Sequence, residues 1–152
     1  MLFRKAYNNI KKWYESDNKN ALLVDGARQI GKTFLIRNFL KENVDSYIEF
    51  NLYENDLIKD AFKTINNTKE LLIKISALAT KPLIKNKTII FIDEVQVADD
   101  IITKVKFLIE EGSYRYIFSG SLLGISYKNI DSLPVGYMDI LEMYPLDFEE
   151  NN

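Results

Sequence analysis

Gly26-Ala27-Arg28-Gln29-Ile30-Gly31-Lys32-Thr33 is the stretch that decides the fold of this 152-residue chain. The octet matches G-x-x-x-x-G-K-[ST] at every fixed position, and this is the pattern of a phosphate-binding loop. It follows a short apolar run, residues 21–24, and precedes a helical pattern, which is the strand–loop–helix setting that such a loop needs. The sequence therefore predicts a binding site for a nucleoside triphosphate.

Each part of the octet has a physical task in that site. The glycines at 26 and 31 allow backbone torsions that a side chain would forbid, so successive N–H groups can converge on a polyphosphate. Lys32 places an ammonium near the β- and γ-phosphates, and the Thr33 hydroxyl can bind Mg²⁺. The helix that begins here adds the positive end of its dipole. The expected nucleotide-binding residues are Gly26, Ala27, Arg28, Gln29, Ile30, Gly31, Lys32, Thr33 and Phe34.

A second apolar run, residues 88–92, leads into Asp93-Glu94. Such a run is typical of a strand buried in a parallel sheet, and ligands of open α/β sheets bind at the carboxyl ends of the strands. Asp93 would then meet Lys32 and hold Mg²⁺, while Glu94 is placed to polarise an attacking water. A kinase needs no second carboxylate, because its acceptor hydroxyl replaces water, so the pair favours hydrolysis. The alternative is a solvated acidic pair at the start of the next helix.

Composition limits the remaining chemistry. The length suits one domain, and 47% hydrophobic with 28% charged residues is typical of a soluble globule. Cysteine and histidine are both absent, which leaves carboxylate, lysine, hydroxyl and metal–phosphate chemistry. A net charge of −2 without a basic stripe or aromatic platform does not support nucleic-acid binding. No secretory leader or membrane span is recognised, so the expected location is cytoplasmic, with no membrane partner.

Apolar periodicity predicts strands that alternate with helices. Residues 1–20 are expected to form a helix and turn packed on a core formed by residues 21–152. Strands are expected within 21–24, 46–52, 88–92, 114–118 and 137–143, with helices after the phosphate loop and over 57–65, 71–79 and 101–109. This alternation implies an α/β three-layer sandwich, with a mostly parallel sheet of about five strands and helices on both faces. Trp13 could dock the first helix or stack on an adenine, and docking is favoured.

Four segments together carry a resemblance to a known family. They are the phosphate loop, Ile90–Gln96, Phe118–Ser121 and Met143–Glu150. In order and spacing they resemble prokaryotic AAA-type ATPases, in the group whose members carry a C-terminal domain of unknown function. The resemblance implies a P-loop NTPase core, ATP with Mg²⁺, and a polar sensor at Ser119 to Ser121, for which an ordinary Ser-Gly-Ser turn is the alternative. The expected catalytic residues are Glu94, Lys32, Ser119 and Ser121, and the expected metal ligands are Thr33 and Asp93.

The chain departs from this family in two ways. Many relatives place an arginine after the glycine that precedes the fifth strand, whereas here Gly136 is followed by Tyr137. Relatives also continue past residues 145–148 into a helical lid and the C-terminal domain. Arg115 begins its strand, roughly 13 Å from the ligand edge, too far to reach the γ-phosphate of its own site. An arginine finger contributes about 10³–10⁵ in rate, so we expect slow turnover unless the missing domain or a partner subunit completes the site.

The leading interpretation is therefore an ATP-binding domain that hydrolyses ATP to ADP and phosphate with Mg²⁺. The alternative is a nucleotide-binding switch, or a truncated remnant, that binds ATP without productive hydrolysis. A GTPase is a third option, since Asn86-Lys87 matches the start of the guanine-reading N-K-x-D motif. However, residue 89 is isoleucine and the pair precedes a strand instead of following one. What the turnover drives is left open by the sequence.

Overall fold

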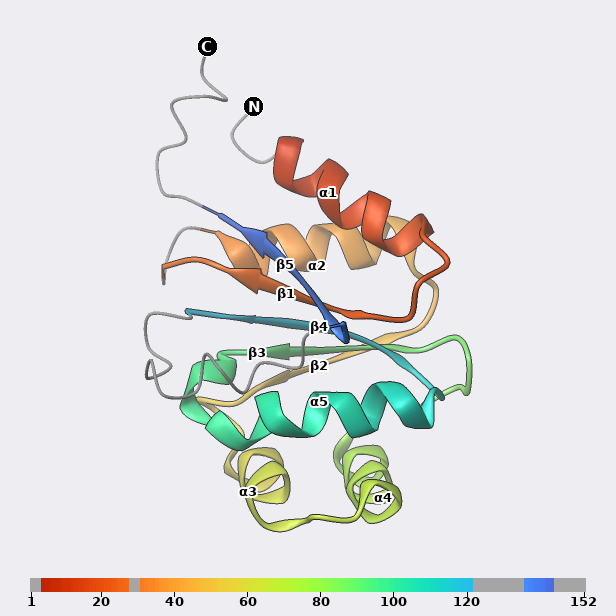
Figure 1. The fold of residues 1–152 in the computed structure, drawn as a ribbon, viewed down its shortest axis with the longest axis vertical. Helices are drawn as coiled ribbons and strands as arrows, with labels where there is room; N and C mark the ends of the chain where they lie inside the picture. The colour runs from red at the N-terminus through yellow and green to blue at the C-terminus, as the bar shows by residue number, and fades with distance from the viewer. Residues whose placement is uncertain (1–3, 28–30, 122–135, 144–152) are drawn as a thin grey trace.

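The computed structural model describes residues 4–27, 31–121 and 136–143 (Figure 1). Within these ranges a five-stranded sheet forms the central layer, with its strands in the order β2-β3-β4-β1-β5. The strands are β1 (Ala21–Asp25), β2 (Tyr47–Asn51), β3 (Ile89–Asp93), β4 (Arg115–Gly120) and β5 (Met138–Glu142). Every described pairing is parallel, which confirms the expected α/β fold and its sheet.

Helices cover both faces of this sheet (Figure 1). One face carries α1 (Arg4–Glu15) and α2 (Lys32–Asn43), and the other carries α3 (Asp56–Thr64), α4 (Thr68–Leu78) and α5 (Asp99–Glu111). A short 3₁₀ helix, η1 (Val95–Val97), joins β3 to α5. Strands that are parallel neighbours need long connections such as these helices, because a tight hairpin would reverse the direction of the chain. Of the helices described, none has the length and apolar character to cross a membrane.

Side chains of the buried strands contribute to two hydrophobic cores, one on each face of the sheet. On β3, Ile90 and Ile92 pack with α3, α4 and α5, whereas Ile89 and Phe91 pack with α1 and α2. Successive side chains of a strand point to opposite faces, so a strand covered on both sides is apolar at every position. The continuous apolar run before Asp93 is thus the signature of a central strand.

Arg115 anchors α1 at the N-terminal end of β4. Its guanidinium lies 4.1 Å from the centroid of the Trp13 ring and donates hydrogen bonds to the carbonyls of Trp13 (2.9 Å) and Tyr14 (2.7 Å). Burial lowers the pKa of Arg115, and the aromatic face with the carbonyls at the end of the helix compensates the cation. Trp13 itself is 5% exposed and lies at the sheet end opposite the phosphate loop. This placement favours the docking role of Trp13 over stacking on a nucleotide.

Candidate functional site

Parallel pairing brings the carboxyl ends of the central strands to one edge of the sheet. Across β3 and β4, Ile92 pairs with Phe118, so the next residues, Asp93 and Ser119, lie side by side. Beside them β1 leads into the phosphate loop, and the backbone N–H of Gly26 donates to the carbonyl of Gly120 at 3.2 Å. The start of the loop, the acidic strand end and the end of β4 therefore share one edge.

The phosphate loop turns into α2 at Gly31. This residue has φ 90° and ψ 14°, in the left-handed region that strains any residue with a side chain. Its carbonyl accepts from the N–H of Leu35 at 2.9 Å, which starts the helix and places Lys32 and Thr33 in its first turn. The three remaining loop residues, Arg28, Gln29 and Ile30, lie outside the described residues, so their contacts with a nucleotide stay predictions.

Lys32 folds back against the loop. Its side chain is 6% exposed, and Nζ donates to the carbonyls of Gly26 (2.5 Å) and Ala27 (2.8 Å). Burying an ammonium is costly unless it is hydrogen-bonded, and these carbonyls supply such partners. Phe34 follows Thr33 in α2 and is the last of the expected nucleotide-binding residues. Its side chain is 61% exposed. The loop thus has a buried positive charge on its inner side and an aromatic ring toward solvent.

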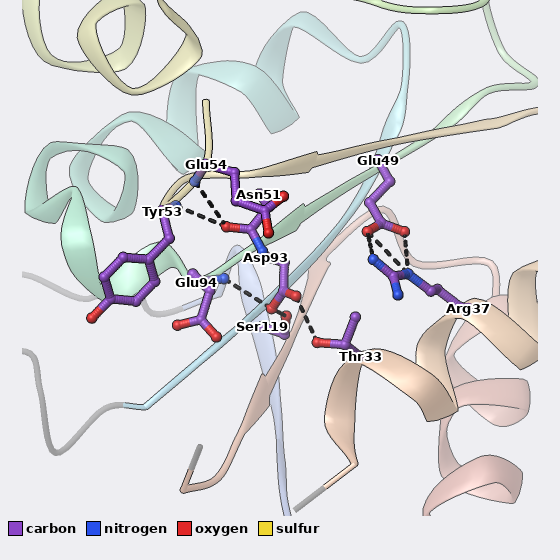
Figure 2. A network of polar contacts seen from close by, with 9 residues as sticks. All are labelled: Thr33, Arg37, Glu49, Asn51, Tyr53, Glu54, Asp93, Glu94 and Ser119. Carbon is purple, nitrogen blue, oxygen red and sulfur yellow. Dashed lines mark hydrogen bonds and ion pairs between the residues drawn. The ribbon is translucent and has the colours of Figure 1, made fainter. Parts of the chain in front are cut away.

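Asp93 is the centre of the polar network at this edge (Figure 2). Oδ2 accepts from the Thr33 hydroxyl at 2.6 Å, and Oδ1 accepts from the Ser119 hydroxyl at 2.5 Å and the Glu94 N–H at 2.9 Å. The residue is only 2% exposed, and a buried carboxylate is tolerated when donors replace its water. The structure therefore brings both predicted metal ligands together and adds Ser119 to them.

Glu94 leaves β3 in an unusual backbone conformation, with φ 62° and ψ 44°. A left-handed residue other than glycine costs about 1–3 kcal/mol, and such strain concentrates at functional sites. Its Oε2 accepts from Nε2 of Gln96 at 2.6 Å. Figure 2 shows the Glu94 carboxylate beside, but separate from, the carboxylate of Asp93. The two acidic groups therefore have different hydrogen-bond partners.

The two predicted sensor serines have different surroundings. Ser119 pairs with Val24 of β1, and Gly120 pairs with Asp25 of β1. Ser119 and Gly120 therefore lie in strand β4 and not in a turn, whereas Ser121 follows the strand. Ser119 is fully buried with its hydroxyl on Asp93, whereas the backbone N–H of Ser121 donates to Oε1 of Gln96 at 3.3 Å. Contact of either hydroxyl with a phosphate or water stays a prediction.

Two further features of this edge were missed from the sequence. Arg37 of α2 makes a bidentate ion pair with Glu49 of β2. Its Nε donates to Oε1 at 2.8 Å, and its Nη2 donates to Oε2 at 2.5 Å. Glu49, by hydrogen bonding, raises the pKa of Arg37. Asn51 ends β2 with an Asx turn, its Oδ1 accepting from the N–H groups of Tyr53 and Glu54 (Figure 2). Only the turn had a sequence signal, an asparagine near the end of an alternating strand.

The side-chain oxygens gathered here fit Mg²⁺. This ion prefers hard oxygen ligands and binds through one or two carboxylates, waters and substrate phosphates, so it needs no cage of protein groups. Thr33 and Asp93 supply a hydroxyl and a carboxylate whose oxygens are 2.6 Å apart. Over the described part of the chain no three His, Cys, Asp or Glu side chains cluster so that they could hold a metal ion, and a magnesium–nucleotide site requires no such cluster.

A parallel α/β sheet with this loop, lysine and threonine at a helix start, and a carboxylate on a neighbouring strand defines a P-loop nucleotide-binding domain. The family model of the AAA domain matches residues 18–152, so the chain belongs to this family. The match confirms the AAA-type ATPase core expected from the four segments, and with it an ATP-binding domain.

Solved structures show the same fold, among them the Orc1 protein of Aeropyrum pernix in complex with DNA, with a TM-score of 0.58 at 13% identity. The match covers 95% of this chain and 44% of the Orc1 chain, so the chain spans less than half the length of that protein. At this identity the likeness concerns the fold alone. Among proteins of curated function, none matches the chain in sequence.

Proposed function

We propose that this domain hydrolyses Mg-ATP to ADP and phosphate at the carboxyl edge of its sheet. The observation that carries the proposal is the meeting of Thr33, Asp93 and Ser119 beside Glu94, from three different elements (Figure 2). A P-loop domain that only transfers phosphate to a hydroxyl has no need of the second acidic residue. The acidic pair therefore favours water as the acceptor.

Binding would be shared between the loop and the adjacent strand end. The predicted loop N–H groups from Gly26 to Thr33 and the start of α2 would present positive dipoles to the triphosphate, and Lys32 would add a full charge for the β- and γ-phosphates. Thr33 and Asp93 would hold Mg²⁺, with Ser119 orienting the Asp93 carboxylate. When bound, Mg²⁺ neutralises charge that develops on the phosphate oxygens.

Glu94 is the proposed general base. As the oxygen of a water attacks the γ-phosphorus, Glu94 accepts a proton from that water. The bond from the γ-phosphorus to the β–γ bridging oxygen breaks, and its electron pair leaves with ADP. Glu94 then releases the proton to solvent, so one ATP and one water become ADP and phosphate. The left-handed backbone of Glu94 supports this role, because such strain concentrates at functional sites.

The placement of two of the four arginines favours slow turnover by the isolated domain. Arg115 is committed to α1 at the opposite end of the sheet, and Arg37 is paired with Glu49. We propose that a further domain or a partner subunit supplies the guanidinium that stabilises the transition state. The same placement supports the alternative, a switch that binds ATP without hydrolysing it. GTP is disfavoured, because Asn86 and Lys87 precede β3 at the edge away from the loop.

Two substitutions separate binding from chemistry. Glu94→Gln should keep the dissociation constant of Mg-ATP within about threefold and lower the single-turnover rate by about 10²–10⁴. Asp93→Asn should weaken Mg²⁺-dependent binding itself. The measurements are single-turnover phosphate release and equilibrium binding, with the exposed Glu110→Gln as the matched control. Hydrolysis by Glu94→Gln at the parental rate would refute the assignment, and a parent that binds Mg-ATP but releases no phosphate would establish the switch.

A further inference from the structure

Gln96 links the Glu94 carboxylate to the end of β4. It lies in η1, where its Nε2 donates to Oε2 of Glu94 at 2.6 Å and its Oε1 accepts from the N–H of Ser121 at 3.3 Å. A carboxylate only accepts and a backbone N–H only donates, so these partners fix which end of the amide faces which group. One side chain thus joins the strand end that carries the acidic pair to the strand end that carries the serines.

The amide is also confined by packing. A Cβ on Gly120 would lie 2.4 Å from Oε1 of Gln96, closer than real Cβ atoms approach, and at a tight 3.0 Å from Cγ2 of Val95. Gly120 has no positive φ, so its backbone conformation does not require glycine. Glycine at this buried position of β4 instead makes room for Gln96. Val95 is fully buried under the same strand. The Gln96 side chain is therefore held between η1 and β4.

Each acidic residue is held from β4 by a different route. The Ser119 side chain holds Asp93 directly, whereas the backbone of Ser121 holds Glu94 through Gln96. A glutamate side chain has several rotatable bonds, and a base displaced by about 1 Å can lose about 10²-fold in rate. The Gln96 donor on Oε2 restricts those rotations. The two carboxylates thereby keep separate positions at the end of one strand.

We propose that Gln96 is a positioning residue for ATP hydrolysis: it holds the Glu94 carboxylate where water is activated. This inference rests on the proposed function, in which Glu94 accepts the proton. Gln96 itself contacts neither the phosphates nor Mg²⁺ in this scheme and acts only through Glu94. Its loss should therefore lower the rate of the chemical step and leave ATP binding nearly unchanged.

Two variants of Gln96 test the link. Gln96→Met keeps the length of the side chain and removes both hydrogen bonds. Gln96→Glu keeps the shape and an acceptor for the Ser121 N–H, but it cannot donate to Glu94 when ionised and adds a like charge. Both should lower the single-turnover rate by about 10–100-fold, with the Mg-ATP dissociation constant within about threefold of the parent.

A double-mutant comparison distinguishes positioning from a general structural effect. In the Glu94→Gln background, Gln96→Met should cause no further fall in the residual rate, because the carboxylate it positions is gone. An equal fall in both backgrounds, or a parental rate in Gln96→Met, would overturn the inference while leaving the role of Glu94 intact. If Glu94→Gln itself hydrolyses ATP at the parental rate, the proposed function fails, and the inference fails with it.

Discussion

The Ser119 hydroxyl is one of three donors that the described residues give to the buried Asp93 carboxylate, so its removal tests how the site is held together. Ser119 is fully buried, Asp93 is 2% exposed, and their oxygens are 2.5 Å apart. A hydrogen bond to a charged group contributes about 1.5–3 kcal/mol, and water cannot easily replace it at a buried position. We expect Ser119→Ala to lower the free energy of unfolding by about 2 kcal/mol. For a domain of this size that is a fall in Tm of about 4–8 °C.

The measurement is urea and thermal unfolding followed by far-UV circular dichroism, without nucleotide. Ser76→Ala is the matched control, because Ser76 is exposed on α4 and its loss should change stability by less than about 0.5 kcal/mol. Ser119→Ala with parental stability would show that the Asp93 carboxylate does not depend on this donor. An equal loss in the control would show that the effect is not specific to the site.

Two further substitutions test contacts away from this edge. Arg115→Ala removes two hydrogen bonds and the stacking on Trp13, so we expect a loss of about 2–3 kcal/mol and early release of α1. Because Trp13 is the only tryptophan, its fluorescence should change before the circular dichroism does, and coincident transitions at the parental Tm would contradict this. Tyr116→Phe should be neutral or stabilising by about 1 kcal/mol in urea unfolding, because the buried Tyr116 hydroxyl has no hydrogen-bond partner among the described residues. A loss above about 1 kcal/mol would reveal a partner for it.

The fold and the outline of the site were predictable because their signals are local. The octet predicts a strand, a turn and a helix in that order, and the apolar run before Asp93 is typical of a strand covered on both faces. Ligands of open α/β sheets bind at the carboxyl ends of the parallel strands, and this rule alone predicts that Asp93 lies near Lys32. Ser119 was harder, because serine and glycine disfavour strands and the extra pairing comes from β1.

The contacts that refine the site depend on geometry that no spacing rule contains. The Gln96 bridge needs Glu94 in a left-handed conformation and a 3₁₀ turn packed against Gly120. Likewise, the pairing of Arg37 with Glu49 depends on how α2 lies over β2, which is at the edge of the sheet. Each is a contact between side chains from different elements, and the sequence specifies the elements more strongly than their relative positions.

Binding of Mg-ATP to the Gly26–Thr33 loop is the claim on which the proposed chemistry rests. Its most direct test is the thermal shift caused by Mg-ATP in the parent, in Lys32→Ala and in Lys41→Ala, an exposed lysine of the same helix. Each protein is compared with itself without nucleotide, so a change in intrinsic stability does not confuse the result. At 100 times the dissociation constant the ligand should add about 2.7 kcal/mol, a shift of about 5–10 °C. We predict this shift in the parent and in Lys41→Ala and its near loss in Lys32→Ala, whereas an equal shift in all three proteins would contradict binding at this loop.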